Sequence, residues 1–156
     1  DVPNVAETDD TKAGWGLRFA LDTSKYLLTI SNKKGSVFYD GLYSERPDII
    51  DVPAGEYVIK LRSGEFIEPS KDLPLFGEDK VVKAIADSTF SVKLASAQLT
   101  GGIRVKVTEN FKKYFKGTRL YYIKDSAVYC QNYNGTYLYV FFYPGTVNVV
   151  YKNKDG

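Results

Sequence analysis

Five carboxylates between residues 65 and 79 are the side chains of this sequence whose types and spacing could do chemistry: Glu65, Glu68, Asp72, Glu78 and Asp79. A pair of such groups held roughly 5 to 10 Å apart is what a glycosidase needs, and clustered carboxylate oxygens can bind calcium weakly. The stretch has no periodic pattern and contains two prolines and a glycine, which predicts a long loop. We interpret its carboxylates as solvated, and keep a glycosidase as an alternative.

Histidine is absent and cysteine occurs once, which removes most other catalytic and metal-binding chemistry. Nucleophile pairs of the Ser-His-Asp and Cys-His kinds require a histidine, and so do most zinc sites. Cys130 ends an apolar, strand-like stretch that begins at Ala127, so we expect a buried and unreactive thiol. We therefore predict a protein that is not an enzyme and that uses no cofactor and no metal.

Aromatic residues dominate the strand-like stretch 137–143. Tyr137, Tyr139 and Tyr143 fall on one face together with Phe141, because alternate residues of a strand share a face. The other face is apolar as well, which two arrangements explain. A central strand covered on both sides would bury the tyrosines, whereas an exposed row could stack on sugar rings or contact a protein partner. The three tyrosines are our candidate contact residues.

A basic and aromatic stretch lies at residues 108–117. Lys112, Lys113 and Lys116 are interleaved with aromatic residues at helical spacing, and Gly117 closes the turn. This pattern is superficially like a nucleic-acid patch. However, the net charge of the whole chain is only +2, and we expect the aromatic residues to pack on a sheet while the lysines face water. We predict no nucleic-acid partner.

These residues must be positioned by strands, and the clearest strand signal follows a proline and a glycine. A turn at Pro53–Gly55 leads into Tyr57, Ile59 and Leu61, which alternate with other side chains. Proline presets φ for a turn, glycine allows a positive φ, and a period of two places one apolar row on one face of a sheet. The same unit returns at residues 144–151. Both stretches predict a turn followed by a strand.

Further short strands separated by turn-forming residues are expected along the whole chain, and no convincing helix occurs before residue 100. The expected ranges are 15–21, 25–31, 36–39, 80–85, 89–94, 102–108, 119–124, 127–131 and 136–143. This succession predicts an all-β fold built of antiparallel β-sandwiches.

The composition changes near Thr100. Residues 1–100 carry a net charge of −4 and residues 101–156 a net charge of +6, and 9 of the 13 tyrosines follow residue 100. A shift of this size indicates a domain boundary. We predict a flexible N-terminal tether at 1–14, a first β-sandwich module at 15–100 and a second module at 101–156.

The two modules look like diverged copies. Residues 26–30 resemble residues 120–123, and each stretch is followed by a polar turn, a short strand and a proline-containing turn. The second copy lacks the strands that follow residue 61 in the first, so we expect it to be incomplete. The missing strands could lie beyond residue 156, which we favour, or a partner could supply a strand to the open edge.

The succession resembles an uncharacterised family of surface-lipoprotein domains of Bacteroidetes, which is related to fimbrillin-like cell-adhesion proteins with transthyretin-like modules. The resemblance covers about residues 15–116 and rests on the turn at Pro53–Gly55, the loop 74–78 and the stretch 105–115. It implies tandem transthyretin-like β-sandwich modules in an exported protein at the cell surface. It also implies a lipid anchor in the outer membrane, here outside this chain, and an adhesive or fimbria-related structural role. Partners would be other pilus subunits or surface glycans, and a glycan-binding module of a polysaccharide-uptake system is the alternative.

Two tripeptides resemble the acceptor motif for protein O-glycosylation in the same bacteria. They are centred on Ser88, between Asp87 and Thr89, and on Ser126, between Asp125 and Ala127. A polar turn would have the same composition. Ser88 and Ser126 are therefore candidate modification sites.

Overall fold

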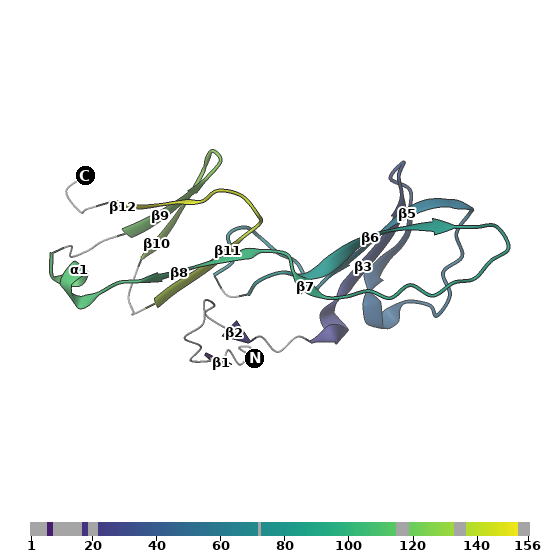
Figure 1. Cartoon of the computed structure of the whole chain (residues 1–156), viewed down its shortest axis with the longest axis horizontal. Helices are drawn as coiled ribbons and strands as arrows, with labels where there is room; N and C mark the ends of the chain where they lie inside the picture. Colours follow the sequence, from purple (N-terminus) through teal and green to yellow (C-terminus); the bar gives the residue numbers. More distant parts are fainter. Residues whose placement is uncertain are drawn as a thin grey trace. The chain divides into compact units, whose positions relative to one another are not determined.

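A computed structural model gives the fold of the chain and describes residues 6–7, 17–18, 22–71, 73–114, 119–132 and 137–152. These residues form antiparallel sheets with one short α-helix, which confirms the predicted all-β class (Figure 1). The predicted tether at 1–14 lies outside the described residues except for β1 (Ala6–Glu7), which pairs with β2 (Leu17–Arg18). No helix in the described ranges has the length and apolar character needed to cross a membrane.

Contacts between residues divide the chain into two compact units. Unit 1 comprises residues 1–64 and 79–94, and unit 2 comprises residues 65–78 and 95–156. The long segment that follows the first Pro-Gly strand thus groups with the C-terminal residues. The domain boundary that composition suggests near Thr100 stays a prediction.

Unit 1 is built around one sheet, in which β3 (Leu27–Asn32) lies between β4 (Val37–Leu42) and β5 (Gly55–Arg62) and is antiparallel to both. The hairpin between β3 and β4 turns at Gly35, whose φ of +88° is open to glycine at no steric cost. On its other side β5 neighbours β6 (Phe76–Ala84), and the first residues of β6 pair with β7 (Ala97–Gln98) in unit 2.

The predicted inward row of β5 is confirmed. Tyr57, Ile59 and Leu61 are all buried, and the last two join Tyr26 and Leu28 in the core of unit 1. The Tyr57 hydroxyl donates a hydrogen bond of 2.6 Å to the carbonyl oxygen of Pro53. The tyrosine that fills the core therefore also closes the Pro-Gly turn, which explains why these residue types occur together.

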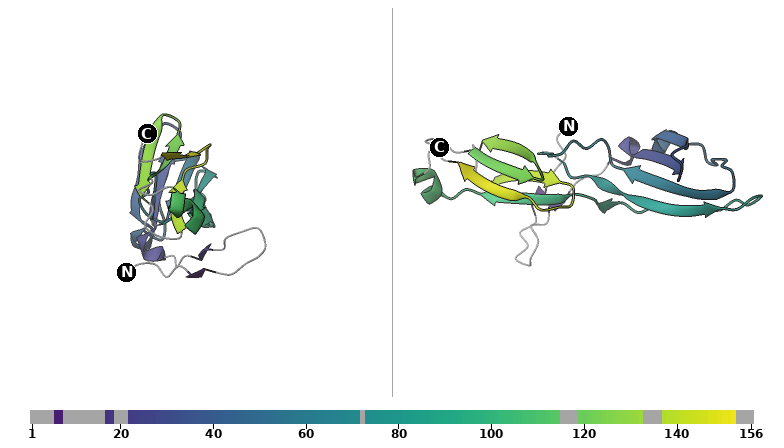
Figure 2. Two further views of the ribbon diagram at one scale, coloured as in Figure 1. Left: turned by 90° about the vertical axis from the view of Figure 1, so that its left-hand side faces the viewer. Right: turned by 90° about the horizontal axis from the view of Figure 1, so that it is seen from above.

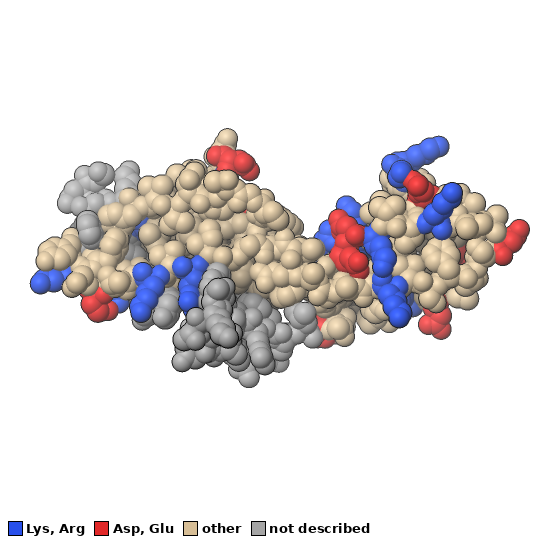
Figure 3. Space-filling model, in the orientation of Figure 1, with Lys and Arg blue, Asp and Glu red and all other residues tan. Residues whose placement is uncertain are grey.

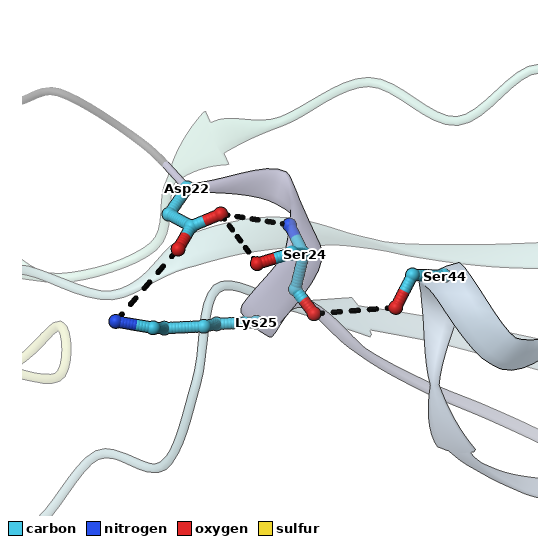
Figure 4. A network of polar contacts seen from close by, with 4 residues as sticks. All are labelled: Asp22, Ser24, Lys25 and Ser44. Carbon is cyan, nitrogen blue, oxygen red and sulfur yellow. Dashed lines mark hydrogen bonds and ion pairs between the residues drawn. The ribbon is translucent and has the colours of Figure 1, made fainter.

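A short polar network precedes β3 (Figure 4). The Asp22 carboxylate accepts hydrogen bonds from the backbone and the hydroxyl of Ser24 at 3.0 and 2.6 Å, and it caps the 3₁₀-helix η1 (Thr23–Lys25). Ser44 in a second 3₁₀-helix, η2 (Tyr43–Glu45), donates to the Ser24 carbonyl oxygen. The hydrogen bonds from Ser24, side chain first, and then the charge of Lys25 lower the pKa of Asp22.

Two strand predictions in this part of the chain are wrong. Strand β6 begins at Phe76 rather than at residue 80, and residues 89–94 form no strand. Val92 and Leu94 nevertheless pack against the core of unit 1. Nearby backbone groups are bound by side chains instead of a neighbouring strand, since Lys80 Nζ donates to the Lys93 carbonyl oxygen at 2.6 Å. Alternating side chains thus predicted the packing of this segment but not its hydrogen bonding.

Unit 2 contains two small sheets that share one core. One sheet has the order β10 (Ala127–Asn132), β9 (Arg119–Lys124), β12 (Asn148–Lys152), and the other pairs β8 (Gly101–Lys106) with β11 (Tyr137–Phe142). The two sheets lie on opposite sides of the core (Figure 2). The buried residues of this core are Leu120, Tyr122, Leu138, Val140 and Phe142.

The expected helical turn is present as α1 (Glu109–Tyr114). The Phe111 ring packs edge-on against Tyr151 with ring centroids 4.9 Å apart. However, Tyr114 is largely exposed, so the expectation that all aromatic residues of this turn pack on the sheet is wrong. Lys112 forms an ion pair of 2.8 Å with Glu109 on the same helix.

The same arrangement of three strands occurs in both units. A central strand, β3 or β9, lies between its hairpin partner, β4 or β10, and the strand that follows a Pro-Gly turn, β5 or β12. In unit 1 the strand β5 has a second neighbour, β6. Among the described residues, β12 has only β9.

Charge is unevenly spread over the visible faces of the two units (Figure 3). The face of unit 1 carries both acidic and basic side chains, whereas most of the visible face of unit 2 carries neither. In unit 1 the ion pairs include Arg62 with Asp79 at 2.6 Å and Lys33 with Glu56. A hydrogen bond from Lys33, and then its charge, lower the pKa of Glu56.

Candidate functional site

The three candidate tyrosines lie on or directly after β11. Tyr137 pairs with Lys106 of β8 and Tyr139 pairs with Arg104. Tyr139 is half-buried, and the side chain of Tyr137 lies outside the described part of the structure. Tyr143 follows the strand and is 41% exposed. Of the row that the sequence suggests, Tyr143 is thus the ring that the described residues leave most open.

A segment from far upstream covers the second edge of β11. We call residues 65–71 the strap. The Ser70 amide donates to the Phe141 carbonyl oxygen at 3.0 Å, and the Phe141 amide donates to the Ser70 carbonyl oxygen at 2.7 Å. Strand β11 therefore has β8 on one edge and the strap on the other. Phe141, which is buried, shows how fully this end of the strand is covered.

Tyr143 is fixed by the strap on two sides. Its backbone amide donates to Glu68 Oε1 at 2.8 Å. Its ring meets the Phe66 ring nearly edge-on, with centroids 5.0 Å apart and an interplanar angle of 72°, a favourable aromatic geometry. Lys124 Nζ lies 5.9 Å from the Tyr143 ring centroid. The ring is thus both accessible and pre-positioned.

The same carboxylate oxygen binds the Lys124 ammonium. Lys124 Nζ donates to Glu68 Oε1 at 2.5 Å, and the two side chains are 10% and 22% exposed. An ion pair with so little water around it is unlike a surface pair, because each charge depends on the other for solvation. Lys124 occupies an inward position of β9, in line with Leu120 and Tyr122. In the sequence, a lysine that continues the alternating apolar positions of a strand indicates that its charge needs a buried partner, and this signal could have identified the pair of Lys124 and Glu68.

A shallow hollow of about 280 Å³ adjoins Tyr143. The described residues that line it carry no charge; they are Gly101, Gly102, Ile103, Phe142, Tyr143, Pro144, Gly145 and Val147. Gly145 has a φ of +150°, and a Cβ atom there would lie 3.0 Å from Lys124 Cε. The backbone conformation therefore favours glycine at this turn, and a Cβ atom would also make a tight contact with the lysine side chain. The turn, the ion pair and the aromatic ring form one continuous site within unit 2.

The acidic stretch that opened the sequence analysis is not simply a solvated loop. Glu68 binds Lys124 and Tyr143, Glu78 Oε2 accepts the Ala95 amide at 2.5 Å, and Asp79 binds Arg62. Asp72 lies outside the described residues. No group of three metal-ligating side chains occurs among the residues that the structure describes. Glu68, Glu78 and Asp79 thus each have a structural partner, whereas Glu65 is exposed, as expected for a solvated carboxylate.

The two candidate modification sites share a local geometry. Asp87 and Asp125, which precede Ser88 and Ser126, have φ values of +55° and +53°. Both serines are exposed, although the Ser88 hydroxyl donates to the Ile85 carbonyl oxygen at 2.8 Å. Ser126 lies in the turn between β9 and β10.

The expectation of a buried thiol is wrong. Cys130 is exposed, because it lies on β10 at the edge of its sheet, directly opposite Tyr121. An apolar neighbourhood in sequence does not bury a residue of an edge strand when its side chain points away from the core.

Comparison of the chain with protein-family models, curated proteins and solved structures found no match. The family resemblance described above is therefore a hypothesis that rests on the residues quoted for it.

Proposed function

We propose that this chain is a pair of tandem transthyretin-like β-sandwich modules, the second incomplete, with an adhesive or fimbria-related structural role. In this proposal the protein is exported and held at the cell surface by a lipid anchor outside this chain. It binds other pilus subunits or surface glycans, and catalyses no reaction. In this proposal the protein acts by binding alone: rigid β modules present loops, strand edges and exposed aromatic rings to a partner.

The observation that carries this proposal is the three-strand arrangement common to both units. In each, a central strand pairs with its hairpin partner on one side and with the strand that follows the Pro-Gly turn on the other. Repetition of one structural unit is typical of modular surface proteins, in which tandem domains separate a contact site from its anchor. The family resemblance points to the same class.

The state of the acidic residues favours this proposal over a glycosidase. A glycosidase needs two carboxylates that face one substrate. Glu68 is instead committed to Lys124 and to the Tyr143 amide, and Asp79 to Arg62. We therefore assign these carboxylates to the architecture of the modules.

Adhesion of beads tests the proposed function. Beads coated with the purified chain should bind bacterial or host cells more than beads coated with an unrelated β protein. Tyr143→Ala should reduce this binding several-fold, whereas Tyr114→Ala, which removes another exposed tyrosine of unit 2, should not. Protease added to intact cells of the source organism should also remove the protein. Beads that bind no better than the control, or a protein protected from protease, would contradict the proposal.

Glycan binding is the second candidate, and the hollow beside Tyr143 favours it. The hollow combines an exposed aromatic ring with three glycines and has room for a small ring, and sugar rings stack on aromatic faces. On a glycan array, the chain should bind specific sugars, and Tyr143→Ala should abolish the signal with circular dichroism unchanged. Adhesion that persists without any glycan signal would favour a protein partner instead.

We also propose O-glycosylation at Ser88 and Ser126, on the basis of the tripeptides and their exposed turns. Intact-mass measurement on protein from its native host should show added hexose-type mass, which the Ser88→Ala and Ser126→Ala variants lose. A mass equal to that of the bare polypeptide would remove this proposal.

A further inference from the structure

The sheet of β10, β9 and β12 has an apolar face on the side that points away from the core of unit 2. Leu120 and Tyr122 of β9 belong to that core. Tyr121 and Ile123 alternate with them and therefore lie on the other face of the sheet. The register places Cys130 and Val150 beside Tyr121, and Val128 and Asn148 beside Ile123. We call these six residues the outer patch.

The outer patch is open to solvent. Val128 is 60% exposed, Val150 is 42% exposed, and Cys130 is exposed as well. None of the six residues carries a charge. The outward face of an antiparallel sheet normally bears polar side chains, and a contiguous exposed apolar patch usually marks an interaction site.

The equivalent face of unit 1 shows that the fold does not require apolar residues at these positions. There the central outward row consists of Asp40 of β4, Thr29 of β3 and Lys60 of β5. The Thr29 hydroxyl donates to the Asp40 carboxylate at 3.0 Å. Because the two units have the same three-strand arrangement, the apolar side chains of the outer patch are not needed to form the sheet, and a partner explains them better.

Opposite charges lie at the two ends of the outer patch. Arg119 begins β9, two residues before Tyr121, and Asp125 follows β9, two residues after Ile123. Both charged residues are exposed, and neither forms an ion pair with another described residue. The midpoint of β9, at Tyr122, is thus equally far along the chain from a positive and from a negative side chain.

We propose that the outer patch is an interaction surface for the same patch of a second copy of this chain. The two sheets pack face to face around a two-fold axis that lies between them, runs across the strands and crosses β9 at Tyr122. This rotation places Tyr121 of each copy over Ile123 of the other. It also places Arg119 over Asp125 at both ends of the interface. A two-fold axis along the strands would instead place Arg119 over Arg119, so charge complementarity selects the antiparallel arrangement.

The association should be weak. Three strands about 4.8 Å apart, with six residues of about 3.4 Å each in β9, give a face of roughly 300 Å². Even if the relief of the side chains doubles this area, it stays below the roughly 800 Å² that each partner buries in a standard interface. We therefore expect a dissociation constant on the order of 10⁻⁴ M. Packed sheets cross at about 30°, an offset that the long side chain of Arg119 can span.

Sedimentation equilibrium of the full natural polypeptide, from about 10 µM to about 1 mM, tests the inference in the range that this affinity sets. We expect the weight-average mass to rise with concentration. Arg119→Asp and Asp125→Arg should each weaken the association about tenfold or more, since like charges then meet at both ends. Lys113→Asp is the matched control for Arg119→Asp, because it changes the net charge equally at an exposed position of α1.

A mixture of the two single variants separates this contact from damage to the fold. Arg119→Asp and Asp125→Arg, each with an unchanged circular dichroism spectrum, should associate again when mixed in equal amounts, because each supplies the charge that the other needs. Val128→Lys, at a 60% exposed position of the outer patch and away from Arg119 and Asp125, should also abolish the rise in mass. A natural polypeptide that stays monomeric throughout would overturn the proposal, as would association that is insensitive to all three substitutions or variants that stay apart when mixed. The inference does not rest on the proposed adhesion, because a chain that pairs through the outer patch but fails the bead assay would lose only the proposed function.

Discussion

Replacing Glu68 by glutamine should loosen unit 2 while leaving unit 1 unchanged. The substitution preserves size and an acceptor for the Tyr143 amide, but it removes the charge that faces Lys124 Nζ at 2.5 Å. The Lys124 side chain is only 10% exposed, so water cannot fully replace the lost carboxylate. The perturbation therefore isolates the electrostatic part of the site.

The expected loss follows from the burial of the pair. Removing one partner of a fully buried ion pair costs about 3–5 kcal/mol, because the other charge is left unpaired. Glu68 is 22% exposed, so we expect about 2 kcal/mol, which corresponds to a roughly 30-fold larger opening equilibrium for β9 and β11. Adding Lys124→Met to Glu68→Gln removes the stranded charge and should restore at least about 1 kcal/mol, as expected when a buried pair is replaced by neutral groups.

Hydrogen exchange followed by mass spectrometry measures this loss separately for each unit. Peptides from β9 and β11 should exchange faster in Glu68→Gln, and peptides from β3 and β5 should serve as an internal reference. Glu109→Gln is the matched control, because the Glu109 side chain is 87% exposed in its pair with Lys112, and an exposed pair of this kind is worth less than about 0.5 kcal/mol. The reasoning fails if Glu68→Gln behaves like Glu109→Gln, or if the double variant is less stable than Glu68→Gln alone.

Three further predictions concern turns and caps. Tyr57→Phe removes the hydroxyl that closes the first Pro-Gly turn and should destabilise unit 1 by about 1–2 kcal/mol in exchange measurements; unchanged protection of β5 would contradict this. Gly145→Ala should destabilise unit 2 by roughly 1–3 kcal/mol, mainly because of backbone strain at a φ of +150°. Gly101→Ala, whose new Cβ atom meets open space, should cost less than about 1 kcal/mol. Asp22 should titrate below its ordinary pKa of 3.8, so its cap stabilises the fold above that pH and is lost as the pH falls through the lowered pKa. An NMR titration of Asp22 with a midpoint at or above 3.8 would refute that prediction.

Local patterns predicted the strands well where one side of a strand faces a core. The alternation of Tyr57, Ile59 and Leu61 correctly identified both the strand and its buried face. The predicted strand at 119–124 has the bounds of β9. Such patterns succeed because burial of every second side chain is a property of a strand and its own sequence.

Other features could not be predicted from neighbouring residues. Residues 89–94 alternate like a strand but find no strand partner, and Cys130 lies in an apolar stretch but on the outer side of an edge strand. In both cases the outcome depends on which segment lies alongside, and that is decided by the topology of the sheets.

For this protein, composition and periodicity alone determined the all-β class, the two Pro-Gly turns and the apolar faces of most strands. The tertiary structure decided the partners of the strap, where Glu68 reaches Lys124 across 56 positions of sequence. It also decided the strand order of the sheets, in which β12 pairs with β9. The physical reason is range: side-chain alternation and turn chemistry act over a few residues, whereas an ion pair or a strand neighbour exists only once distant segments have packed together.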